Sequence, residues 1–227
     1  MEEANQIRGT SLLELVAVMD RLRSPGGCPW DARQTHESLV EYLVEEAYET
    51  VEAIETSDDP GLREELGDLL LQVVFHARIA QEREDEGWNI DDVAQGIIDK
   101  LIRRHPHVFA DVDAETAEQV EANWHALKAV EKGRSSVTDG IPEHLPALLR
   151  ASKVRARSAT LADRLPDLPG DRQAERILEP VTSEDEFGDL LLALASNARD
   201  RGWDAEGALR QAVRRRIDQI RGIEQGS

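Results

Sequence analysis

The chain has 227 residues, 40% of them hydrophobic and 32% charged, which is typical of a folded globular protein with one or two domains. Its 46 acidic and 27 basic residues give a formal net charge of −19, which argues against a nucleic acid or an anionic membrane as a partner. A single cysteine, Cys28, excludes an intrachain disulfide, and no apolar run approaches the ~18 residues that span a bilayer, so we expect a cytoplasmic protein.

The first half of the chain is predicted to be all-α, because apolar residues recur at helical spacing and aromatic residues make up only 4%. From Val40 to Ile54 the apolar residues follow a 4-3-4-3 spacing, which is typical of the seam of a helical bundle. Thr35 is a candidate N-cap for this helix, and Asp59 with Pro60 is predicted to begin the next one. The expected helices cover residues 12–22, 35–56, 59–86, 91–104 and 114–132.

The second half is predicted to be a shorter helical unit that follows a linker. Residues 133–146 are rich in Gly, Pro and Ser, which favours the linker. The segment 161–182 contains three prolines and should be broken or disordered. Helices are expected over residues 147–158, 183–201 and 205–224.

An internal repeat connects the two halves. Glu65-Leu-Gly-Asp68, followed by three leucines, recurs 121 residues later as Glu186-Phe-Gly-Asp189, again followed by three leucines. We therefore expect two tandem copies of one helical unit. The predicted organisation is a first unit over residues 1–132, the linker over 133–146 and a degenerate second unit over 147–227.

The strongest chemical signal is a concentration of carboxylates on the second and third expected helices. The second helix carries six glutamates between positions 41 and 55, and no Lys or Arg occurs over residues 34–62 to relieve their repulsion. Two pairs of acids, Glu46 with Glu49 and Glu65 with Asp68, have i,i+3 spacing, so each pair projects from one side of its helix. Paired acids on two consecutive helices indicate a shared binding site.

The two pairs can face each other across a helical hairpin. At a rise of about 1.5 Å per residue, both lie roughly 9–17 Å from the turn that joins the helices. Four carboxylates beside an apolar core cannot all ionise without a cation, and Mg²⁺, with Mn²⁺ as a possible substitute, suits oxygen ligands. The competing interpretation is an acidic solvated face, which we assign to Glu41, Glu52 and Glu55. For Glu45, a role in the metal site or in positioning water and a surface role both remain open.

The order of these acids resembles the EExxE and ExxD motifs of the MazG-type all-α nucleoside triphosphate pyrophosphohydrolases. Glu45, Glu46 and Glu49 match the first motif, and Glu65 and Asp68 match the second. Further similar segments lie at residues 27–35 and 100–109, and the resemblance is dense over residues 11–132.

This resemblance implies hydrolysis of a nucleoside triphosphate to the monophosphate and pyrophosphate. It implies that Mg²⁺ is held by Glu46, Glu49, Glu65 and Asp68, where it would neutralise the phosphate chain and activate or orient water. Either Glu45 or a ligand carboxylate would accept the proton of the attacking water. A pocket built mainly on phosphate and stacking contacts would be permissive for the base, which suits the house-cleaning role in the nucleotide pool that the resemblance implies.

Substrate contacts are expected from three further groups of residues. Cations at the end of the fourth expected helix are favoured as phosphate ligands over a simple complement to the helix dipole. A Trp-x-x-x-Lys pair in the fifth expected helix resembles the family's nucleotide-contacting pair, with a core Trp beside a surface Lys as the alternative. A loop Trp before the acidic helix either lines the base pocket or anchors the loop. The expected substrate-binding residues are Lys100, Arg103, Arg104, Trp124, Lys128 and Trp30.

The second unit is predicted to be non-catalytic, because no EExxE motif precedes Glu186 and a capping box with Ser183 explains that glutamate without a metal. One unit has too few helices to bury its apolar seams, so we expect a homodimer that completes a four-helix bundle, as the resemblance also implies. A nucleotide-binding regulatory module without turnover is the main alternative function. A di-iron oxidase is disfavoured, because no histidine follows a glutamate at the required i,i+3 spacing.

Overall fold

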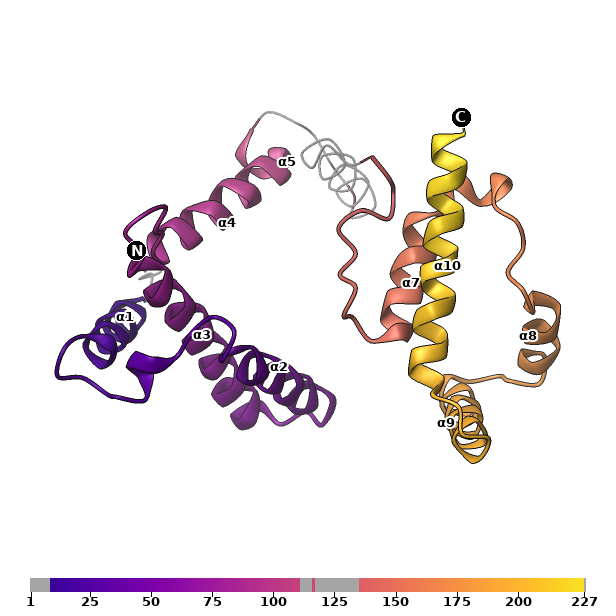
Figure 1. Ribbon diagram of the computed structural model, residues 1–227, viewed down its shortest axis with the longest axis horizontal. Coiled ribbons are helices and arrows are strands. Elements are labelled where there is room, and N and C mark those ends of the chain that lie inside the picture. The colour runs from indigo at the N-terminus through magenta and orange to yellow at the C-terminus, as the bar shows by residue number, and fades with distance from the viewer. Residues whose placement is uncertain (1–8, 111–115, 117–134, 227) are drawn as a thin grey trace, which may run out of the picture. The chain divides into compact units, whose positions relative to one another are not determined.

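The computed structural model describes residues 9–110, 116 and 135–226. Throughout these ranges the only regular secondary structure is helical, which confirms the prediction of an all-α fold. The chain divides into two compact units, one within residues 1–124 and the other within residues 125–227 (Figure 1). No helix in the described ranges is long and apolar enough to cross a membrane.

The first unit is built on a pair of antiparallel helices. Helix α2 and helix α3 form this hairpin, and α1 packs against α3 (Figure 1). Helix α4 follows the end of α3 and contacts it. The elements are α1 (Thr10–Arg23), the 3-10 helix η1 (Asp31–Arg33), α2 (Val40–Glu55), α3 (Asp59–Gln81), α4 (Ile90–Arg104) and α5 (Pro106–Phe109). The helix predicted over residues 114–132 lies outside the described residues.

The ends of the hairpin helices differ from the sequence prediction. Thr35 does not cap α2, because it exchanges hydrogen bonds with Ser38 in a turn that precedes the helix. Asp58 rather than Asp59 caps α3, and its Oδ1 accepts a hydrogen bond of 3.2 Å from the backbone N–H of Gly61. Helix α3 ends at Gln81 rather than at the expected residue 86, and Glu86 itself has a φ of 55°, which a right-handed helix cannot include.

The core of the first unit joins α1 to the hairpin. Its most buried side chains interlock α1, the start of α2 and the second half of α3, and their removal from water is the main force that holds these elements together. This core leaves the carboxylate-bearing halves of α2 and α3 at the hairpin's other end. The buried members are Met19, Leu39, Val74 and Phe75.

A buried arginine fixes the loop between α1 and α2. The guanidinium of Arg23 donates to both carboxylate oxygens of Glu82, at 2.8 and 2.7 Å, and to the backbone carbonyls of Asp31 and Gln34. The loop also passes close to the end of α1, because a Cβ added to Gly27 would lie 2.3 Å from the carbonyl oxygen of Leu22. These contacts set the position of the η1 segment against α1.

The second unit is built on α7 and α10, which pack against each other. The segment predicted as broken or disordered carries most of a 3-10 helix and the short helix α8. Helix α9 contacts α10 and is otherwise mostly exposed. The elements are α7 (Ala147–Arg157), η2 (Ala159–Arg164), α8 (Asp171–Leu178), α9 (Glu184–Asp200) and α10 (Ala205–Gln225).

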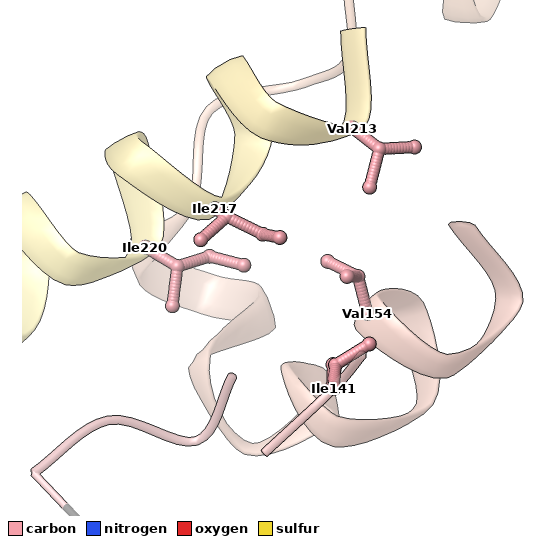
Figure 2. Close-up of a cluster of buried hydrophobic side chains, with 5 residues drawn as sticks. All are labelled: Ile141, Val154, Val213, Ile217 and Ile220. Atoms are coloured by element: carbon pink, nitrogen blue, oxygen red, sulfur yellow. The ribbon is translucent and has the colours of Figure 1, made fainter. Parts of the chain in front are cut away.

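The segment predicted as a linker contributes to the core of the second unit. Figure 2 shows the side chain of Ile141 directed toward Val154 of α7, beside Val213, Ile217 and Ile220 of α10. The described part of this segment, from residue 135 onward, therefore packs onto the helices rather than spacing them apart. Its Gly and Pro content reflects tight turns rather than a free spacer.

Candidate active site

The antiparallel hairpin brings the two acidic motifs together. One carboxylate oxygen from each of Glu46 and Glu49 on α2 and Glu65 on α3 lies within 4.8 Å of the other two. Glu46 and Glu65 are half-buried, whereas Glu49 is exposed. The juxtaposition arises because Thr56, Ser57 and Asp58 make a tight connection, so both motifs lie at the same height above the turn.

Mutual repulsion and partial burial disfavour full ionisation of this cluster. Burial, followed by the charges of Asp68 and Glu49, raises the pKa of Glu46 above its ordinary value. Burial and then the charge of Glu49 raise the pKa of Glu65, which also shares a hydrogen bond with Glu49. Asp68 therefore belongs to the electrostatic cluster, although it is not among the three acids with the closest oxygens.

The donor set fits a hard divalent cation. Oxygen ligands of Mg²⁺ lie about 2.0–2.1 Å from the ion, so oxygens that share one ion are at most about 4.2 Å apart. The three closest carboxylates are slightly wider than this, at up to 4.8 Å, and their flexible side chains allow the remaining approach. A cation would also relieve the repulsion that raises their pKa values.

Two other sequence-predicted residues lie on α2 or contact it. Glu45 is exposed, and its charge is the smallest of those that raise the pKa of Glu46. Trp30 is 46% exposed, and its ring meets that of Tyr42 edge-on at 6.1 Å between centroids. Tyr42 lies four residues before Glu46 on α2, so this aromatic pair is about one helical turn from the carboxylates.

The expected phosphate ligands are not brought to the carboxylates. Lys100 is half-buried, Arg103 is exposed and Arg104 is only 5% exposed, all near the end of α4. Helix α4 leads away from the α2–α3 hairpin (Figure 1). Trp124 and Lys128 lie outside the described residues. The assignment of these five residues to substrate binding therefore remains a prediction.

A histidine pair that the sequence analysis missed lies farther along α3. The Nδ1 atoms of His36 and His76 are 2.7 Å apart, and Trp88 stacks on His36 with 6.2 Å between centroids. Burial, followed by the charge of His36, lowers the pKa of His76. Asp68, Gln72 and His76 follow one another at intervals of four residues on α3. This spacing alone predicts that the three polar side chains share one face of the helix.

The matching acids of the second unit are arranged differently. The carboxylate of Glu186 accepts hydrogen bonds from the backbone N–H of Thr182 at 2.7 Å and from its hydroxyl at 3.0 Å. These bonds lower the pKa of Glu186. The Oγ of Ser183 accepts from the N–H of Glu186, which is one half of the predicted capping box, and the carboxylate of Glu186 bonds to Thr182 at the start of α9. Within the described part of this unit, no three acids gather as they do in the first.

Comparison with known proteins places this geometry in a family. Residues 34–109 match the MazG nucleotide pyrophosphohydrolase domain. The chain is 41% identical to the nucleoside triphosphate pyrophosphohydrolase/pyrophosphatase MazG of Thermotoga maritima, covering 93% of this chain and 85% of that protein. It is also 41% identical to the nucleoside triphosphate pyrophosphohydrolase of Escherichia coli, over 92% of this chain and 86% of that protein.

Two further similarities complete the comparison. A 26.1 kDa protein of the blaB 3′ region in Streptomyces cacaoi is 51% identical, covering 95% of this chain and 84% of that protein. A solved structure of a MazG-related protein from Thermotoga maritima is 31% identical and covers 52% of this chain and 97% of its own, with a TM-score of 0.42. Matched by the family domain across the acidic hairpin and by full-length relatives across most of its length, this chain belongs to the MazG nucleotide pyrophosphohydrolase family.

Proposed function

We propose that this protein hydrolyses nucleoside triphosphates to the nucleoside monophosphate and pyrophosphate in the presence of Mg²⁺, with Mn²⁺ as a substitute. The observation that carries the proposal is the meeting of the α2 and α3 carboxylates within a chain of the MazG family. Glu46, Glu49, Glu65 and Asp68 would hold the metal. Relatives that this chain matches over most of their length are named for this activity.

The chemistry requires attack by water on the α-phosphorus. A bond forms between the water oxygen and this phosphorus while the bond to the oxygen bridging the α- and β-phosphorus breaks, and pyrophosphate leaves. Bound Mg²⁺ would supply neutralisation of the phosphate charge and a lower pKa for a coordinated water. Glu45 or one of the ligand carboxylates accepts the proton of the attacking water.

Recognition of the nucleotide is proposed to rest on stacking and on phosphate contacts. Trp30 is exposed and contacts Tyr42, about one turn before Glu46 on α2, which supports a role against the base. Lys100, Arg103 and Arg104, with Trp124 and Lys128, are proposed to contact the nucleotide. Such contacts discriminate weakly between bases, so we propose permissive, house-cleaning hydrolysis in the cytoplasm.

We further propose that two copies of the chain associate through their hairpins. The apolar seam predicted on α2 is exposed in the single chain, at Val40, Val44, Val51 and Ile54. Helix α3 also exposes an apolar row of three residues spaced four and three apart, which matches a helix–helix contact face. This row consists of Leu66, Leu70 and Val73. A second hairpin packed on these stripes would complete a four-helix bundle.

Release of pyrophosphate tests the proposed activity. The full chain is incubated with each common nucleoside triphosphate, with Mg²⁺ or with EDTA, and pyrophosphate and monophosphate are measured together. We expect equal amounts of the two products, dependent on the metal. Nucleotide binding without either product would instead support the regulatory module, and release of inorganic phosphate alone would contradict cleavage at the α-phosphorus.

A further inference from the structure

A buried arginine in the second unit has no counter-ion among the residues that the structure describes. Arg150 of α7 is only 3% exposed. Its Nε and Nη1 atoms are buried and find no hydrogen-bond acceptor in the same part of the chain. Arg150 lies one turn after the fully buried Ala147 and one turn before the core residue Val154, so it occupies the face of α7 that packs on α10.

A second arginine, Arg210 of α10, lies at about the same height along the α7–α10 helix pair as Arg150. The carboxylate of Glu206 accepts from the backbone N–H of Ala147 and from Nη2 of Arg210, each at 2.9 Å, which ties the starts of the two helices together. Arg150 follows Ala147 by three residues, and Arg210 follows Glu206 by four, which corresponds to advances of about 4.5 and 6 Å along the helices. The Nε atom of Arg210 is also buried and lacks an acceptor in the described residues.

Within the described ranges, this arrangement leaves three buried donor nitrogens and a guanidinium charge without compensation. Arginine cannot lose its proton in a protein, so it cannot avoid the cost of burial by becoming neutral. An unpaired buried charge costs several kcal/mol, which is of the same order as the stability of a small domain. The nearby acid, Glu206, already accepts from two other donors. An additional anion is the partner that would balance this charge.

The helices around these donors are locally basic in a strongly acidic chain. Helix α7 contains four basic side chains and no acidic one, and α10 contains five arginines against three acids. The net charge of the whole chain is −19. The local excess of positive charge would concentrate small anions at the α7–α10 pair despite the overall charge.

We propose that Arg150 and Arg210 form a binding site for a small free oxyanion of the phosphate class, such as phosphate or pyrophosphate. The planar guanidinium fork offers parallel N–H groups that match two oxygens of a tetrahedral oxyanion. The site lies in the second unit and uses none of the α2–α3 carboxylates. This proposal can therefore be tested independently of the proposed catalytic activity.

Thermal unfolding of the full chain in EDTA tests the site without turnover. The midpoint is followed by circular dichroism while sodium phosphate or pyrophosphate replaces sodium chloride at constant ionic strength. We expect the parent midpoint to rise by at least about 4 °C at saturating phosphate, because a ligand that binds only the folded state stabilises it. The variant Arg150→Met should lose this rise and, in chloride alone, unfold at or above the parent midpoint, because no uncompensated charge is buried.

Arg214→Met is the matched control, since it removes the same charge from an exposed position of α10. It should keep the phosphate-dependent rise. If Arg150→Met does not fold, Arg150→Lys keeps the charge without the planar fork and should weaken the apparent phosphate affinity at least about tenfold, or about 1.4 kcal/mol.

An equal phosphate-dependent rise of the unfolding midpoint in the parent and in the Arg150 variant would overturn the proposal. A parent midpoint that depends on protein concentration but not on phosphate would overturn it too, because the counter-ion would then be a carboxylate of a second copy.

Discussion

The carboxylates of Glu46, Glu49, Glu65 and Asp68 repel one another unless a cation is bound. Burial and then this repulsion raise the pKa values of both Glu46 and Glu65, and the charges of Glu49 and Asp68 contribute to each. Natural helices seldom carry such unrelieved charge, since like charges at i,i+4 each cost about 0.2–0.5 kcal/mol. The cost is intelligible if these residues are kept for binding a metal rather than for stability.

Replacing Glu49 by alanine separates the effect of this carboxylate on metal-dependent activity from its effect on stability. We expect Glu49→Ala to lower metal-dependent pyrophosphate release at least about a hundredfold, because one of the proposed ligands is lost. The metal-free variant should unfold at or above the parent midpoint, since one repulsive charge is gone. Steady-state pyrophosphate release and thermal unfolding in EDTA measure the two effects. Glu52→Ala, one turn farther along α2 and outside the cluster, should change neither, and full activity in Glu49→Ala would contradict the ligand assignment.

At the scale of elements, the Arg23–Glu82 ion pair joins α1 to the end of α3, next to a second pair between Asp20 and Arg78. Arg23 is almost fully buried, and it holds Glu82 while also satisfying two carbonyls of the loop that carries Trp30. The hydrogen bond from Arg23 is the largest of the effects that lower the pKa of Glu82 below its ordinary value of 4.5. Since the folded pKa is lower than the unfolded one, the ionised pair stabilises the fold above about pH 4.5, and this contribution is lost as the pH falls through the folded pKa.

Glu82→Gln should therefore destabilise the protein in a pH-dependent way. We expect a loss of about 1–3 kcal/mol in the free energy of unfolding at pH 7, less than for a fully buried pair, because the Glu82 side chain is 38% exposed. Urea unfolding of parent and variant at pH 7 and again below pH 4.5 measures the difference, which should shrink at the lower pH. Glu84→Gln, on the exposed turn after α3, serves as the control. An unchanged difference at both pH values would show that the charge of Glu82 is not responsible.

The hairpin and its acidic cluster could be predicted because they depend on local spacing. The 4-3-4-3 apolar pattern, the i,i+3 acid pairs and the short turn at residue 57 are all properties of neighbouring residues. The His36–His76 bond and the Arg23–Glu82 pair join residues 40 and 59 positions apart, and no local pattern connects them. The packed turns of residues 135–146 were expected as a linker because Gly and Pro mark both tight turns and free spacers.

At the scale of the whole molecule, the exposed stripes of α2 and α3 predict a dimer. Leu70→Lys places a charge in the middle of the α3 stripe, where burial against a second hairpin would be costly. We expect light scattering on the parent at micromolar concentration to give twice the chain mass of 25.3 kDa, and the variant to give the single mass. Gln81→Lys, exposed at the end of α3, should leave the mass unchanged. A parent with the mass of one chain would contradict the dimer.

The two copies of the repeat should contribute unequally to catalysis. Glu186 is held by Thr182 in a helix cap, and Asp189 is exposed in the second unit, where the described residues place no further acids to share a cation. Glu186→Gln with Asp189→Asn should therefore leave pyrophosphate release within about threefold of the parent, a change in the barrier of under about 0.7 kcal/mol. The amide oxygen that this change introduces at position 186 can still accept one of the Thr182 hydrogen bonds, so the start of α9 should persist.

The same pair of isosteric changes at Glu65 and Asp68 removes two of the four proposed ligands and should lower pyrophosphate release at least about a hundredfold. Both double variants are compared by pyrophosphate release, with circular dichroism as the check on folding. Greater damage from the second-unit pair in a folded protein would reverse the assignment of the active copy.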